Sequence, residues 1–156
     1  MLPRARPRPQ GEAAVFKTIV LALDGSEQSG QAVPLATELA RQNGARIVIA
    51  HIQQDVVGKS GGAIVPNEDE IQADIRKQAE ELSADGIETS VEMREVMLEG
   101  PAHAIVEIAE GANADLIVAG TRGHSTLAGL LLGSVTQRLL HIARCPVLVA
   151  PPTDRS

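Results

Sequence analysis

Residues 115–123 read DLIVAGTRG, and after nine more residues the chain reads GS at positions 133–134. Four consecutive apolar residues after the leading aspartate predict a strand buried on both faces, as in a parallel sheet, and Gly120 is expected to break it. The pattern that follows predicts a helix over Ser134–Ala143, with Ser134 as its N-cap. This stretch therefore predicts a strand, a glycine-spaced loop and a helix in succession.

A strand end followed by glycines and a helix start is typical of an anion-binding loop. Gly120, Gly123 and Gly133 carry no Cβ, so backbone N–H groups can approach an oxyanion closely. The helix N-terminus adds unpaired N–H donors and a partial positive charge, and the hydroxyl of Ser134 can add one more donor. On spacing alone, three ordinary turn glycines explain the pattern equally well.

Outside this stretch, short apolar runs alternate with segments of helical spacing. The order predicts an α/β fold: a single-domain open sheet of five mainly parallel strands with helices on both faces. Pro34 is expected to kink the first helix, which should end at Asn43-Gly44. Strands are expected at Phe16–Leu23, Arg46–Ile52, Thr89–Leu98, Asp115–Ala119 and Pro146–Ala150, and further helices at Glu68–Ala84 and Pro101–Ala109.

Composition excludes several classes of function. The chain has 156 residues, of which 44% are hydrophobic, and its only aromatic residue is Phe16, so it lacks platforms for base stacking. The net charge is −6, and outside the first ten residues 11 basic residues stand against 20 acidic ones. Such an acidic body disfavours generic binding to nucleic acid or to an anionic membrane.

The ends of the chain and its single cysteine point to the cytoplasm. Residues 1–14 are rich in Arg and Pro, lack the apolar core of a secretory signal and are interpreted as a disordered leader. The domain is expected over residues 15–151, with a tail at 152–156. Cys145 can form no internal disulfide and is expected to be a buried, inert thiol. The histidines show no common spacing with Cys145 or with paired acids, so no metal site is expected.

The spacing Gly-x2-Gly-x9-Gly-Ser over Gly120–Ser134 resembles the nucleotide signature of ATP-binding universal stress proteins. The resemblance covers about residues 16–150. It includes Asp24-Gly25-Ser26 after the first strand, His51-Ile52 at the end of the second, and the closing run Cys145–Val149. It implies a Rossmann-like fold of the adenine nucleotide α-hydrolase type.

The resemblance also implies roles for individual residues. Phosphate contacts are implied for Gly123, Gly133, Ser134 and Val135, while Gly120 and Arg122 would line the ribose and phosphate side. Asp24 would hold the ribose or the adenine edge, and Ala22 and Ile52 would receive the adenine. The residues themselves leave an alternative for Asp24, which is an acid favoured near a helix N-terminus.

Three functions follow from the resemblance. The first is an ATP-binding regulator or sensor in stress response, with Mg or Mn bridging the phosphates, an unknown regulatory protein partner and no catalytic residues. The second is a slow ATPase or a self-phosphorylating protein with Ser134, Ser125 or Thr126 as acceptor, and the third is a nucleotide-free dimeric scaffold. A homodimer through the edge strand Pro146–Ala150 is expected by resemblance and because an apolar edge strand tends to be covered.

Overall fold

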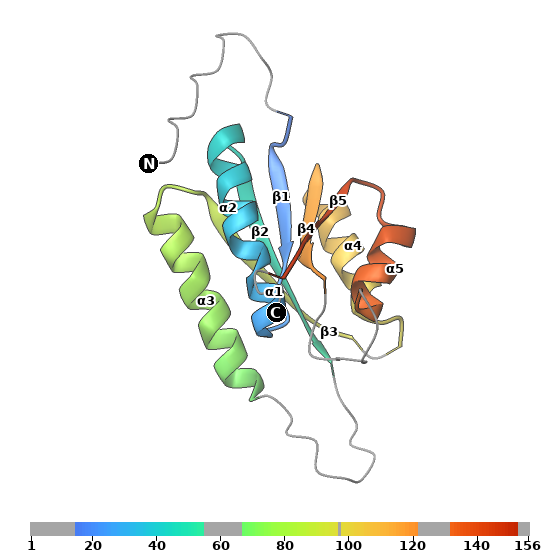
Figure 1. Cartoon of the computed structure of the whole chain (residues 1–156). Coiled ribbons are helices and arrows are strands. Elements are labelled where there is room, and N and C mark those ends of the chain that lie inside the picture. The colour runs from blue at the N-terminus through green and yellow to red at the C-terminus, as the bar shows by residue number, and fades with distance from the viewer. Residues whose placement is uncertain (1–14, 55–66, 97, 122–131, 153–156) are drawn as a thin grey trace.

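The structure is a computed structural model, and it describes residues 15–54, 67–96, 98–121 and 132–152. Strands and helices alternate along the described chain, with two helices after the first strand (Figure 1). The elements are β1 (Thr18–Ala22), α1 (Glu27–Gly30), α2 (Ala32–Asn43), β2 (Arg46–Gln54), α3 (Glu68–Ala84), β3 (Thr89–Val96), α4 (Pro101–Gly111), β4 (Leu116–Gly120), α5 (Ser134–Ile142) and β5 (Val147–Ala150).

The five strands form one sheet in the order β3-β2-β1-β4-β5, and every neighbouring pair is parallel. Helices α2 and α3 cover one face, and α4 and α5 cover the other (Figure 1). The predicted α/β class, with a five-stranded parallel sheet between two layers of helices, is confirmed.

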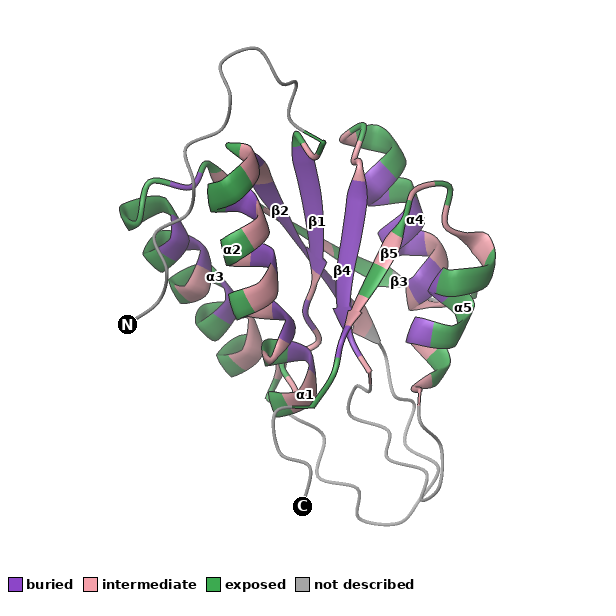
Figure 2. Ribbon diagram, turned by 45° about the horizontal axis from the view of Figure 1, so that its top comes forward, coloured by how far each residue is buried: buried purple, intermediate pink, exposed green. Residues whose placement is uncertain are grey.

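Alternate strand residues build two separate apolar layers, because successive side chains of a strand point to opposite faces. Within β1, Ile19 and Leu21 face α2 and α3, whereas Val20 faces α4. The central strands are buried along most of their length (Figure 2). The core is aliphatic throughout, and Phe16, which is only partly buried, packs at its margin.

Two local predictions were correct only in part. The first helix is interrupted at Gln31, between α1 and α2, three residues before Pro34, and Pro34 itself lies in the first turn of α2, where its missing N–H has no intrahelical partner to lose. The strand β4 ends at Gly120 and not before it, because Gly120 is its last residue and pairs with Ala150. The expected stop at Gly44 is confirmed, with a left-handed φ of 62°.

At the amino-terminal edge of the sheet, Asp115 ties the approach to β4 to the start of β1. Its carboxylate Oδ2 accepts hydrogen bonds from the backbone N–H groups of Lys17 (2.7 Å) and Thr18 (3.0 Å). These two bonds favour the charged form and so lower the pKa of Asp115 below its usual value.

We expect Asp115→Asn to weaken the protein at neutral pH and to matter less in acid. A carboxyl group whose pKa is lower in the folded state contributes stability above its unfolded pKa, and that stability is lost as pH falls through the folded pKa. Urea unfolding at about pH 7 and about pH 3 measures this difference. Asp74→Asn, on the exposed side of α3, is the control. A deficit of the same size at both pH values for Asp115→Asn would contradict the assignment.

Candidate functional site

The candidate site lies at the carboxyl-terminal edge of the sheet, where β1 and β4 part. Their pairing runs only from Ile19 opposite Leu116 to Leu21 opposite Val118. Beyond that point β1 continues beside β2, and β4 continues beside β5 as far as Gly120. The chain passes from β1 to β2 on one side and from β4 to β5 on the other, so this is the topological switch point of the sheet, where open α/β sheets bind ligands.

We call the residues around this point the switch-point site: Ala22–Ser26, Gly120–Thr121 and Gly133–Val135. One side of this site is the turn after β1. The Asp24 Oδ1 accepts the Ser26 N–H at 2.8 Å, and Ser26 in turn caps α1, because its hydroxyl accepts the Ser29 N–H at 3.1 Å. Gly25 has a φ of +83°, a value that favours glycine in this tight turn.

The other side of the switch-point site consists of the end of β4 and the start of α5, which are joined by hydrogen bonds. The Gly133 N–H donates to the Thr121 carbonyl at 2.7 Å, and the buried Thr136 hydroxyl donates to the Gly120 carbonyl at 2.8 Å. These bonds bring both ends of the glycine-spaced loop together. The helix start therefore lies beside the strand end, as an anion site of this kind requires.

The start of α5 differs from the expected one. Gly133, not Ser134, is the N-cap: its φ of −68° and ψ of 161° are extended, and Ser134 is the first helical residue. The prediction of Ser134 as the cap was wrong by one residue. Among the residues that the structure describes, no side chain caps this helix, so none of them engages its first N–H groups as a cap.

Gly120 has a packing role at this site. A Cβ on Gly120 would lie 2.5 Å from the backbone oxygen of Gln28 and 3.1 Å from the Cα of Ser29, both in α1. The glycine thus allows α1 to lie directly against the end of β4. The contact with α1 explains why glycine is needed at position 120 even when no ligand is bound. The implied role of Gly120 beside the ribose and phosphates remains a prediction.

The structure brings most of the predicted site residues to one edge of the sheet. Ala22 and Asp24 lie at the end of β1, and Gly120 lies at the end of β4, with Gly133, Ser134 and Val135 beginning α5. Ile52 lies within β2, and its side chain is buried with the apolar layer under α4. Arg122 and Gly123 lie outside the described residues, as do Ser125 and Thr126.

Sequence reasoning missed one residue beside the site. His51, expected to have an ordinary packing or surface role, is buried, and both of its ring nitrogens are hydrogen-bonded, to the Leu23 carbonyl and to Glu68. A polar side chain inside an apolar strand is a usable signal, because buried polar groups need partners.

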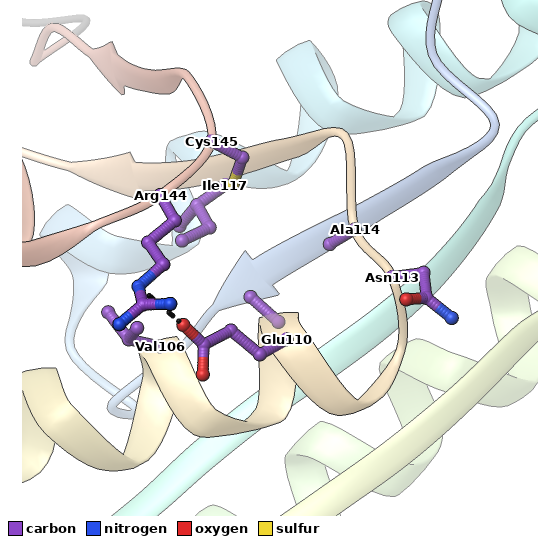
Figure 3. A pocket seen from close by; sticks show the side chains of 8 residues that line it. Val106, Glu110, Asn113, Ala114, Ile117, Arg144 and Cys145 are labelled. Atoms are coloured by element: carbon purple, nitrogen blue, oxygen red, sulfur yellow. Dashed lines mark ion pairs between the residues drawn. The ribbon is translucent and has the colours of Figure 1, made fainter.

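A cavity of about 280 Å³ lies elsewhere, between α4, the connection that precedes β4 and the connection from α5 to β5 (Figure 3). An ion pair between Arg144 and Glu110 (3.1 Å) crosses its lining, and Cys145 borders it. Cys145 is half-buried instead of buried as expected, and burial, together with the charge of Asp115, raises the pKa of its thiol. A raised pKa leaves less thiolate, so the predicted low reactivity agrees with this environment.

In the described part of the chain, no three His, Cys, Asp or Glu side chains lie together as metal ligands. None of its helices has the length and the apolar composition needed to cross a membrane.

The fold and the site define a class: an α/β protein with an open parallel sheet and a candidate ligand site at the switch point. The model of the universal stress protein family matches residues 16–151. The "Universal stress protein in QAH/OAS sulfhydrylase 3'region" of Thermus aquaticus is 38% identical over 138 residues, and the match covers 86% of this chain and 98% of that protein. The chain belongs to the universal stress protein family.

Solved structures agree with this placement. The structure of the protein MJ0577 has a TM-score of 0.75 over 91% of this chain and 99% of its own length, at 22% identity, which is a likeness of fold. A universal stress protein solved in complex with cAMP is 32% identical, with a TM-score of 0.60, and the match covers 86% of this chain and 95% of that one.

Proposed function

We propose that this universal stress protein binds ATP at the switch-point site and acts as a nucleotide-dependent regulator or sensor in stress response. The observation that carries the proposal is the start of α5. No side chain of the described residues caps it, and the Gly133 and Thr136 hydrogen bonds hold it against the end of β4. Each charge-assisted hydrogen bond from this helix start to a phosphate can contribute about 1.5–3 kcal/mol.

The site has two halves that suit the two halves of a nucleotide. The turn with Asp24 would hold the ribose or the adenine edge, with Ala22 and Ile52 toward the base. The start of α5, with Ser134 and Val135, would face the phosphates, assisted by Arg122 and Gly123, which are assigned on sequence alone. The relative at 32% identity that was solved with cAMP supports an adenine nucleotide as the ligand class.

Magnesium or manganese would bridge the phosphates of ATP in this proposal. Mg²⁺ is commonly bound through substrate phosphates and one or two protein carboxylates, not in a cage built only by the protein. The described residues, which hold no cluster of metal ligands, are compatible with this arrangement. The proposal also places the protein in the cytoplasm, where a lone thiol such as Cys145 stays reduced.

Calorimetric titration with ATP, adenosine, cAMP and GTP tests the proposal, each with magnesium and with a chelator. A ligand of the native state at about 100 times its Kd raises stability by about 2.7 kcal/mol, so ATP should also raise the melting temperature. Adenosine should bind more weakly than ATP, and GTP should bind poorly. If ATP gave neither heat nor a higher melting temperature, the proposal would fail.

We propose binding without rapid turnover. Hydrolysis or self-phosphorylation needs an activated water or hydroxyl beside the γ-phosphate. Ser134 is exposed at the start of α5, and among the described residues no His, Asp or Glu side chain is bonded to its hydroxyl. A steady ATPase rate in the ordinary range of about 1–100 per second would favour the enzyme instead.

A homodimer through β5 is part of the proposal, and the two edges of the sheet support it. The outer strand β3 carries Glu92, Arg94 and Glu95, charges of the kind that protect an edge from pairing. The other edge, β5, has the sequence VLVA and no charge. Leu148 on β5 is 36% exposed, whereas Val147 packs against the apolar layer under α4 and α5.

We expect Leu148→Lys to shift the protein from dimer to monomer, because it places a charge in an apolar interface and leaves the core intact. The dimer Kd should rise at least about tenfold, which corresponds to about 1.4 kcal/mol. Sedimentation velocity over a concentration series measures the change. Leu98→Lys, at a residue 95% exposed near the other edge, is the control and should leave the profile unaltered. An unshifted dimer in Leu148→Lys would place the interface elsewhere.

A further inference from the structure

His51 is a buried side chain at the point where β2 passes the end of β1. It is 2% exposed. Its Nδ1 lies 2.8 Å from the carbonyl oxygen of Leu23, and its Nε2 lies 2.7 Å from Oε1 of Glu68, the first residue of α3. One side chain therefore joins β2, the turn of the switch-point site and the start of α3.

The chemistry of the two partners sets how many protons these two hydrogen bonds need. A carbonyl oxygen only accepts hydrogen bonds, so Nδ1 carries a proton and donates it to Leu23. The contact between Nε2 and the Glu68 carboxyl group requires one more proton, which lies either on the ring or on the acid. With both nitrogens engaged, the ring has a single orientation that satisfies its partners.

The Leu23–Asp24 peptide is consequently held at both ends by side chains. His51 donates to the Leu23 carbonyl, and the Asp24 N–H donates to the Ser29 hydroxyl at 3.2 Å. The Leu23 N–H also donates to the Ala50 carbonyl at 3.0 Å. This peptide sets the backbone position of Asp24, whose carboxylate then closes the turn through the Ser26 N–H.

Glu68 connects the same arrangement to α3. Its Oε1 accepts a second hydrogen bond, from the Gln72 side chain at 3.0 Å, one turn further along the helix. The link therefore runs from the first turn of α3 through Glu68 and His51 to the backbone of Asp24. Glu68 and His51 must stay in hydrogen-bond contact for this connection between α3 and the turn after β1 to form.

We propose that His51 is a positioning residue for the nucleoside half of the switch-point site, and that Glu68 holds it in that role. The inference rests on the proposed function, in which Asp24 contacts the ribose or the adenine edge. It adds that nucleoside binding is linked to the position of the first turn of α3. His51 itself contacts no ligand in this arrangement.

Three substitutions in the first turn of α3 test the link, with calorimetric affinity for adenosine as the readout. Glu68→Ala removes the hydrogen-bond partner of Nε2, and adenosine affinity should fall about three- to tenfold, the net effect of one hydrogen bond. Glu68→Gln should restore it to within about twofold, because an amide N–H can donate to an unprotonated Nε2 while Nδ1 stays bonded to Leu23. Glu70→Ala, which removes an exposed acid from the same turn, should bind as the wild type does.

His51→Phe is the second test, since it keeps a ring but neither nitrogen. Adenosine affinity of the folded variant should fall at least about tenfold, and ATP affinity should fall by a similar factor. Leu82→Ala, a core change in α3, is the control for lost stability and should leave adenosine affinity unaltered. If His51→Phe does not fold, the Glu68 series decides the question.

The possible outcomes separate the inference from the function on which it rests. Wild-type protein that binds no adenine nucleotide would overturn the proposed function, and the inference with it. If the wild type binds and Glu68→Ala and any folded His51→Phe bind equally well, the positioning role is wrong and nucleotide binding stands. If Glu68→Gln binds as weakly as Glu68→Ala, the hydrogen bond to Nε2 is not what positions the site.

Discussion

Gly120→Ala is expected to lower the free energy of unfolding by about 2–3 kcal/mol, although it adds a single methyl group. The new Cβ would lie 2.5 Å from the backbone oxygen of Gln28, a separation that side chains do not tolerate. Because that atom belongs to the backbone of α1, relief requires α1 to move away from β4. For a chain of this size such a loss lowers the melting temperature by about 4–12 °C.

Gly30→Ala is the matched control for Gly120→Ala. Gly30 is the last residue of α1, and a Cβ there would meet no atom within 4 Å. Its substitution should be neutral or stabilise the protein by about 0.4–1 kcal/mol, because alanine restricts the unfolded chain. Urea unfolding of both variants measures the contrast. A Gly120→Ala protein as stable as Gly30→Ala would mean that the contact between α1 and β4 is looser than the structure has it.

The parts of the fold that were predicted correctly are those with strong local patterns. Helix α3 was predicted with its correct bounds, Glu68–Ala84, because its apolar residues, among them Ile75, Ala79 and Leu82, repeat at helical spacing over many turns. Continuous apolar runs gave the two central strands, which are buried on both faces. Element type and order follow from such patterns, and with them the position of a site at the carboxyl edge of the sheet.

The missed features depend on contacts between distant residues. Gly120 reads as a strand breaker, but it meets α1 across 92 positions of the chain, and nothing near it in sequence predicts Gln28 as its neighbour. The partners of His51 lie 28 and 17 residues away. The helix start at Gly133 was misplaced because serine and glycine are both acceptable caps, so adjacent positions cannot be separated by residue type.

Gly133→Asp is expected to change stability and ATP affinity in opposite directions. Gly133 has the extended backbone of an N-cap, which other residues adopt without strain, and no side chain in the described part of the chain caps α5. An aspartate there can accept an N–H of the first turn and place a negative charge at the positive end of the helix, so the protein without nucleotide should gain about 0.3–1 kcal/mol. The Gly133 N–H bond to Thr121 does not involve a side chain and should persist.

The same aspartate should weaken phosphate binding strongly if the phosphates of the nucleotide lie at the start of α5, as proposed. Its carboxylate would occupy the N–H donors that the phosphates need and would repel their charge, so ATP affinity should fall at least about 100-fold, or about 2.7 kcal/mol. Adenosine affinity should change little, and Gly133→Asn, a cap of the same shape without charge, should lose less ATP affinity than Gly133→Asp. Urea unfolding without nucleotide and calorimetry with ATP and adenosine measure the two effects on the same samples. Wild-type ATP affinity in Gly133→Asp would show that the phosphates do not lie at the start of α5.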